Sequence, residues 1–95
     1  MPEMHFQVRW PDGHVDNCYS PSLVVREHLR VGASYPLPEF LHRVHTALQQ
    51  ASERVRIKYG HPCTRALGQW SAIEATAQRH PREARVSVLN FDPME

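Results

Sequence analysis

The sequence predicts an α+β fold in which a small antiparallel sheet is covered on one face by an antiparallel pair of helices. Three observations indicate this fold: an alternating segment with a turn motif at the start, two stretches of helical periodicity, and a Val- and Leu-rich segment near the end. The predicted order is β-β-x-α-α-β, where x stands for residues 22–36. A chain of 95 residues has the length of one domain, so we expect a single domain over 1–95.

The first two strands form a β-hairpin. Pro11-Asp12-Gly13 is a tight-turn motif, since proline presets φ and glycine accepts a positive φ. The return strand spans residues 14–19, and we expect Val15 and Tyr19 to point inward. Apolar residues on one face of the first strand alternate with polar ones, and they are Met4, Phe6, Val8 and Trp10.

Residues 22–36 allow two conformations. Ser20 is a suitable cap for a short helix with Pro21 in its first turn. The β-branched pair Val24-Val25 argues equally for an extended edge segment. The conformation of this segment therefore stays open.

The first helix begins at about Pro38 and runs for roughly six turns to a stop at Gly60 and Pro62. Its apolar residues recur at spacings of three and four, and they are Leu37, Phe40, Leu41, Val44, Ala47, Leu48, Ala51 and Val55.

The second helix runs from Thr64, as N-cap, to Arg79. The short connection makes it antiparallel to the first helix. We expect Trp70 to anchor the core beneath the sheet because of its size. The predicted apolar stripe consists of Ala66, Leu67, Trp70, Ile73 and Ala77.

The last strand covers residues 85–91, where the mixed alternation indicates a bulge or cover on both faces. A three-stranded sheet has two open edges, and covering an edge is one physical motive for a homo-oligomer.

Composition limits the function classes. The 11 Lys and Arg exceed the 10 Asp and Glu by one, which weakens any case for bulk attraction to nucleic acid or membrane. No apolar run approaches the roughly 20 residues of a membrane helix, and the first ten residues do not resemble a signal peptide. With only two cysteines, we expect a cytoplasmic protein with reduced thiols.

No metal or other cofactor is expected. His42 and His45 have the i, i+3 spacing that allows two histidines to share a metal. A structural site needs four ligands, and no further Cys or His follows at a regular spacing, so we interpret the pair as part of a solvated face.

Cys63 and Glu74 are the two catalytic candidates. Cys63 follows His61-Pro62 at the start of the second helix, where a thiol pKa is lowered, but it also extends the apolar stripe as a small buried residue would. Glu74 lies inside the predicted stripe, so its carboxylate needs a partner. We expect an interhelical pair with Lys58 or Arg54; the alternative is a recognition carboxylate in an oligomer or ligand cleft.

Two further groups are binding or interface candidates. Gly68, Ala72 and Ala75 lie opposite the apolar stripe and allow close approach of another element, although alanine is also simply a good helix former. Positive charge gathers near the helix hairpin, but alternate positions on a helix diverge, so nucleic-acid binding is a weak prediction. The basic residues are Arg54, Arg56, Lys58 and Arg65.

Extended strings of residues, rather than a catalytic motif, connect the chain to a known family. Together they resemble the small bacterial nitrogen-starvation response proteins encoded beside a nitrilase in a multi-gene cluster. The resemblance covers nearly the whole chain. The strings are Met1–Met4, Arg9–Gly13, Cys18–Ser22, Val24–Glu27, Ser52–Arg56, Lys58–Gly60 with Cys63, and Ile73–Ala75.

The resemblance implies a cytoplasmic protein without an assigned reaction, found with a nitrilase, a radical-SAM protein, an acetyltransferase-like protein and a flavoprotein. Such clusters are associated with nitrogen scavenging from nitriles or cyanide. The resemblance implies no catalytic residues for this chain.

These observations leave three hypotheses of function. The first is a non-catalytic accessory or interaction protein of this pathway, which forms a homo-oligomer and contacts enzymes of the same cluster. The alternative is a small-molecule enzyme or sensor using Cys63 with Glu74 or a histidine. The second alternative is a regulatory nucleic-acid binder.

Overall fold

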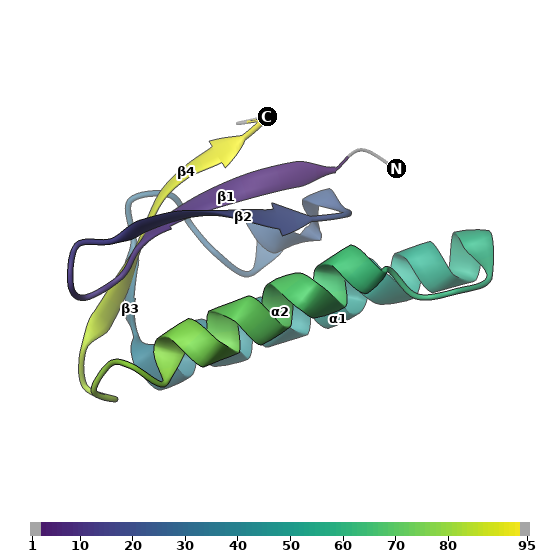
Figure 1. The fold of residues 1–95 in the computed structure, drawn as a ribbon. Coiled ribbons are helices and arrows are strands. Elements are labelled where there is room, and N and C mark those ends of the chain that lie inside the picture. Colours follow the sequence, from purple (N-terminus) through teal and green to yellow (C-terminus); the bar gives the residue numbers. More distant parts are fainter. Residues whose placement is uncertain (1–2, 94–95) are drawn as a thin grey trace.

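The computed structural model describes residues 3–93. The ends of the predicted domain 1–95, with Met1 and Pro2 of the family-like strings, lie outside the described residues. The fold has two layers, a four-stranded antiparallel sheet and a pair of helices below it (Figure 1). This arrangement confirms the predicted α+β class, but the sheet has one strand more than predicted. The elements in chain order are β1 (Met4–Arg9), β2 (Val15–Ser20), the 3₁₀ helix η1 (Leu23–Glu27), β3 (Ser34–Pro36), α1 (Leu37–Tyr59), α2 (Thr64–Ala77) and β4 (Arg85–Asp92).

The core lies between β1 and α1. The inward side chains of β1 and the following Trp10 are all buried, as the alternation predicts. The α1 stripe is buried from Leu37 to Ala51, with Leu41 and Val55 at its margin. The helix ends at Gly60, whose φ of 89° is the left-handed conformation that favours glycine.

The predicted hairpin is confirmed, but the prediction of which β2 residues point inward is wrong. Val15 is 38% exposed and Tyr19 is half-buried, whereas Cys18 and Ser20 are buried. Directly opposed residues of an antiparallel pair share a face. Cys18 pairs with the inward Phe6, while Val15 pairs with the outward Arg9, so the turn geometry turns Val15 and Tyr19 away from the core.

The open segment 22–36 contains both a short helix and a strand. η1 is capped by Ser22, whose Oγ accepts a hydrogen bond from Val24 N at 3.3 Å, so the helical alternative is right and the cap lies two residues after Ser20. β3 pairs with β4, which gives the sheet order β2-β1-β4-β3. A strand of three residues carries too little periodicity to be recognised in the sequence.

The predicted bulge in β4 is present. The pairing of β1 with β4 shifts between Gln7 and Val8, so one residue of β4, Leu89, has no direct partner. The extra residue lets Val88 and Phe91 both face the core.

Both edges of the sheet carry features that discourage further pairing. β3 is short and ends in a proline. On β2, the Tyr19 amide donates to Gln69 Oε1 of α2 at 2.8 Å, so an edge donor is already used within the chain. The motive for self-association that an open edge supplies is therefore weaker than the sequence indicated.

The second helix is shorter and less buried than predicted. It ends at Ala77, and its N-cap is Cys63 rather than Thr64. Its buried residues are Ala66, Ile73 and Ala77, whereas Leu67 is 52% exposed. Trp70 does not anchor the core beneath the sheet, because it lies at the core's margin with its ring stacked on His45 of α1 at 4.4 Å.

A matched pair of substitutions tests whether the apolar stripe of α1 is buried while Leu67 of α2 is exposed. Phe40→Ala should lower the free energy of unfolding by about 3–5 kcal/mol, because it removes a fully buried ring. Leu67→Ala should change it by less than about 0.5–1 kcal/mol, because half of the side chain is already in water. Urea denaturation of both variants provides the measurement, and equal losses would contradict the structure.

Cys18 predicts a pH dependence of stability. Burial, and to a smaller extent Asp16, raises the pKa of the Cys18 thiol from 9.0 to about 12. Between these values the unfolded chain loses a proton that the folded chain keeps, so the free energy of unfolding falls as pH rises, by at most about 1.4 kcal/mol per pH unit. Denaturation at pH 8 and 10 should show this fall in Cys63→Ala and a smaller fall in Cys18→Ala; identical falls would contradict the assignment.

Candidate functional site

The two catalytic candidates do not share a site. Cys63 precedes α2 and Glu74 lies near its end, and eleven residues of helix correspond to a separation of about 16 Å along the axis. A reaction that uses both side chains in one copy of the chain is therefore not supported. The ring of His61 contacts the carbonyl oxygen of Pro62 through Nδ1 at 3.4 Å.

Cys63 is half-buried at the junction of α1, α2 and β2. Its amide donates to Ser52 Oγ at 3.3 Å, which ties the start of α2 to a buried serine of α1. Tyr19 lies beside it. Burial raises the pKa of Tyr19, with a further rise from Cys63, while Arg65, 3.8 Å from the ring centroid, acts in the opposite direction.

The predicted interhelical pair of Glu74 is wrong. Glu74 is exposed, so its carboxylate stays in water and needs no buried partner. Arg54 instead donates to Ser22 Oγ at 3.2 Å and lies 4.0 Å from Glu27, and Lys58 lies over the ring of Tyr59. The sequence pattern placed Glu74 inside the predicted apolar stripe of α2 because that stripe included Leu67 and Trp70, which are not core residues in the structure.

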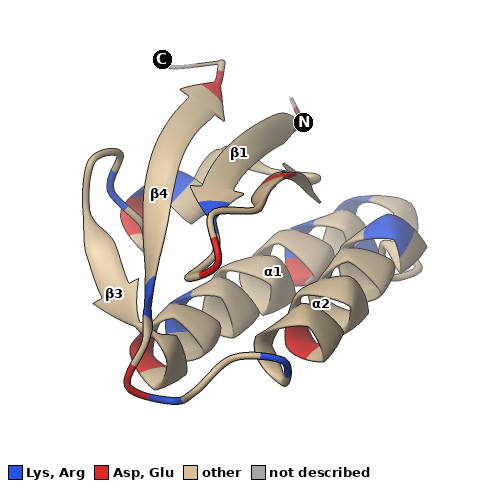
Figure 2. Ribbon diagram, turned by 60° about the vertical axis from the view of Figure 1, so that its left-hand side comes forward, with Lys and Arg blue, Asp and Glu red and all other residues tan. Residues whose placement is uncertain are grey.

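The outward side of α2 is uncharged over residues 66–73. No charged residue lies between Arg65 and Glu74, and Figure 2 shows the middle of α2 without a charged segment. Leu67 is the large apolar residue of this surface. We call it the α2 outer face, and its exposed residues are Leu67, Gly68, Ser71, Ala72 and Ala75.

Gly68 has no evident purpose within the chain. Its φ is not positive, and a Cβ built on it would meet nothing within 4 Å. Glycine in a helix interior costs about 1 kcal/mol relative to alanine. Neither backbone conformation nor close packing inside the chain explains that cost.

Two clefts of about 450 Å³ each flank the end of the α2 outer face and share His80. One has an apolar floor from α1, including Leu37 and Leu41, with Glu74 on its wall. The other lies against the hairpin, beside Asp16. No sequence pattern indicated His80, because its position depends on stacking against the buried Trp10, at 5.7 Å between ring centroids.

Metal binding finds no support from the side chains that the structure describes. Within residues 3–93, no three His, Cys, Asp or Glu side chains are grouped so that they could hold a metal ion. His42 is exposed as predicted, while the ring of His45 is occupied by its stacking on Trp70.

The basic cluster is divided among local partners. Arg54 lies near Glu27, Arg56 pairs with Glu53, and Arg65 lies 3.6 Å from Glu3. The hydrogen bond from Arg56 lowers the pKa of the Glu53 carboxyl. Because each of these guanidiniums has a carboxylate nearby, neighbouring negative charges largely neutralise the positive charge of the helix hairpin.

A double-mutant cycle tests the placement of Glu74. Glu74→Ala, Lys58→Ala and the double variant should show a coupling energy below about 0.3–0.5 kcal/mol, because separate exposed residues act independently. Breaking a buried ion pair would instead cost about 3–5 kcal/mol. Denaturation curves of the four proteins distinguish these outcomes, and a large coupling energy would restore the interhelical pair.

No helix of the described chain is both long and apolar enough to cross a membrane. The chain matches no curated protein and no solved structure. Residues 5–91, nearly the entire length, match the family described as nitrogen starvation-induced protein NitG. This match extends across both layers of the fold and includes the α2 outer face and both of its clefts. The chain therefore belongs to the NitG family of nitrogen starvation-induced proteins, and its role lies in the response to nitrogen starvation.

Proposed function

We propose that the chain is a non-catalytic accessory protein of the nitrogen-starvation response, which acts in the cytoplasm by protein contact through the α2 outer face. The pathway it supports is nitrilase-linked scavenging of nitrogen from nitriles or cyanide, as the resemblance of the sequence implies. The observation that carries the proposal is Gly68, an exposed glycine in a helix interior that neither the backbone nor the packing of the chain requires.

The α2 outer face has the physical properties of a helix-docking surface. Packed helices lie about 8–10 Å apart, and the closer distances require small side chains at the contact. Gly68, Ala72 and Ala75 supply these at spacings of four and three residues, so they fall on one side of the helix. Ser71 is the polar residue between them, and burying its hydroxyl requires a hydrogen-bond partner.

Larger anchors border this flat surface. Leu67 is already half exposed and gains burial in a complex. The flanking cleft with Leu37 and Leu41 on its floor is concave and partly apolar, which is where binding energy concentrates in interfaces. Glu74 on its wall is available to a basic residue of the partner.

The partner that we expect first is a second copy of the chain, because an uncharged helix face of small residues is complementary to itself. Enzymes encoded with this protein are the second class of partner. Two of the interface residues predicted from the sequence, Arg54 and Lys58, belong to α1 and not to the α2 outer face.

Two substitutions at Gly68 test the proposal. Gly68→Arg should leave the monomer folded, because the position is open to solvent, but should prevent close helix approach and reduce association at least tenfold. Gly68→Ala should raise helix stability by about 0.5–1 kcal/mol and disturb association less. Light scattering after size exclusion measures self-association of both variants, and pairwise pull-down measures their binding to the enzymes encoded with this protein.

Ile57→Arg is the matched control, because it introduces the same charge at an exposed apolar residue of α1. It should associate like the unaltered protein. The proposal fails if the unaltered chain neither self-associates nor captures any of these enzymes, or if Gly68→Arg and Ile57→Arg behave alike.

A further inference from the structure

A third cavity, away from the α2 outer face, is lined mainly by basic and polar side chains. It has a volume of about 270 Å³ and lies where the segment after η1 passes over α1. Arg26 of η1, Arg30 of the connecting segment and Arg43 of α1 all line it, with His28 and Tyr35 between them. Two neighbouring arginines of the segment before β3 and one arginine of α1 thus meet at the cavity.

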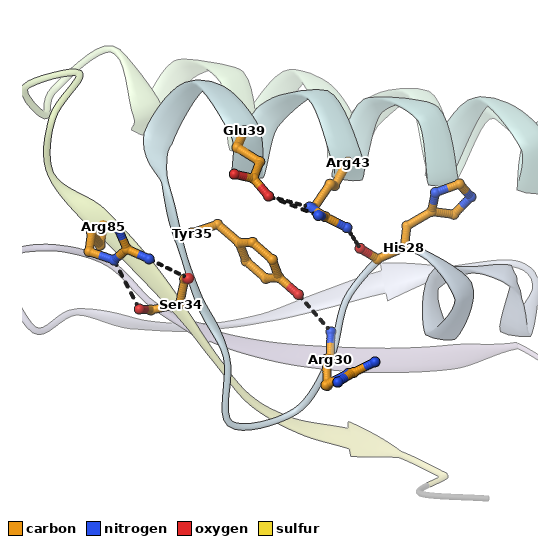
Figure 3. A network of polar contacts seen from close by, with 7 residues as sticks. All are labelled: His28, Arg30, Ser34, Tyr35, Glu39, Arg43 and Arg85. Carbon is orange, nitrogen blue, oxygen red and sulfur yellow. Dashed lines mark hydrogen bonds and ion pairs between the residues drawn. The ribbon is translucent and has the colours of Figure 1, made fainter.

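Arg43 is held in a fixed orientation in the wall of this cavity. Its Nε and Nη2 lie 2.8 Å from Glu39 Oε2, and its Nη1 donates to the carbonyl oxygen of His28 at 2.9 Å (Figure 3). The guanidinium carbon also lies 4.7 Å from the centroid of the Tyr35 ring. These contacts orient the Arg43 guanidinium, and Glu39 balances part of its charge.

The loop around the cavity is also fixed. The amide of Arg30 donates to the Tyr35 hydroxyl at 3.1 Å (Figure 3). Gly32 N donates to Val88 O of β4 at 2.8 Å. Tyr35 itself is buried and belongs to β3. The Arg30 side chain is exposed, so it is free to turn toward a molecule in the cavity.

The Arg26 guanidinium has few hydrogen-bond acceptors among residues 3–93. Its Nη2 donates to the carbonyl oxygen of Pro93 at a long 3.4 Å, and its Nε is buried without a hydrogen-bond partner among the residues that the structure describes. A buried donor without an acceptor is rare and unfavourable. Glu27, the acidic residue of the lining, is exposed and its carboxylate lies 4.0 Å from Arg54.

We propose that this cavity binds a small oxyanion, a carboxylate or a phosphate. The Arg26 and Arg30 guanidiniums donate to its oxygens, and Arg43 adds a fixed positive charge. A modest shift of Arg26 toward the anion gives its unpaired Nε an acceptor. The volume suits inorganic phosphate or an acid of a few carbon atoms and is smaller than the 300–1,000 Å³ of most drug-sized ligand sites.

Titration with sodium phosphate and with sodium succinate, each in a constant chloride background, tests the proposal. We expect saturable binding of one molecule per chain by calorimetry, with amide NMR shifts confined to residues around 26–35 and Arg43. Saturation by phosphate alone identifies a phosphoryl ligand, saturation by succinate alone identifies a carboxylate, and saturation by both indicates recognition of charge. Saturation by neither overturns the proposal.

Two arginine variants test the site, and a third serves as their control. Arg30→Gln should weaken binding at least tenfold and still fold, because its side chain is exposed and only its backbone bonds to Tyr35. Arg26→Gln should weaken binding similarly, and Arg30→Gln decides alone if Arg26→Gln does not fold. Arg9 is an exposed arginine of β1 outside the cavity, so Arg9→Gln should bind the anion normally. Equal weakening in Arg9→Gln would show unspecific charge attraction and overturn the proposed anion site.

Discussion

The burial of Trp10 and the inward face of β1 against α1 is the constraint on which the rest of the structure depends. Trp10 is 1% exposed, its ring meets Phe40 edge to face at 5.7 Å, and its Nε1 donates to Asp16 Oδ2 at 2.8 Å. An indole can be buried at little cost only when its N–H has an acceptor. The hydrogen bond fixes the ring within the hairpin, and the contact with Phe40 links the hairpin to α1. Stacking by His80 connects the same ring to the chain that follows α2.

Because β1 and α1 supply most of the core, α2 has a lighter structural task. It buries three residues, none larger than isoleucine, and otherwise touches its surroundings through polar or marginal contacts such as Gln69 with β2 and Trp70 with His45. A helix with so narrow a buried stripe leaves much of its circumference to solvent. Its lack of charge on that side is the feature that separates it from an ordinary solvated helix, and it links the fold to a role in contact with other proteins.

The basic cavity arises from a different feature, the polar anchoring of the segment between β2 and α1. Leu29, Val31 and Ala33 attach this segment to the core, and hydrogen bonds with Arg43, Tyr35 and Val88 fix its backbone. The same bonds bring arginines of separate elements together. The α2 outer face and this cavity use different residues, so a protein contact and the binding of a small anion are compatible in one chain.

Local periodicity and turn residues were sufficient to predict the hairpin, both helices and the last strand with its bulge, while extended strings of residues were sufficient to indicate the family. Alternation and helical spacing are properties of neighbouring residues, and Gly60 ends α1 through its own φ. Tertiary structure alone decided which face of β2 is buried, because that follows from the register Phe6 opposite Cys18. It also decided the fourth strand and the exposure of Leu67 and Glu74, since both depend on pairing and packing with elements far along the chain. Arg26 and Arg30 lie close together in the sequence, but only the folding of η1 and β3 over α1 brings Arg43 beside them.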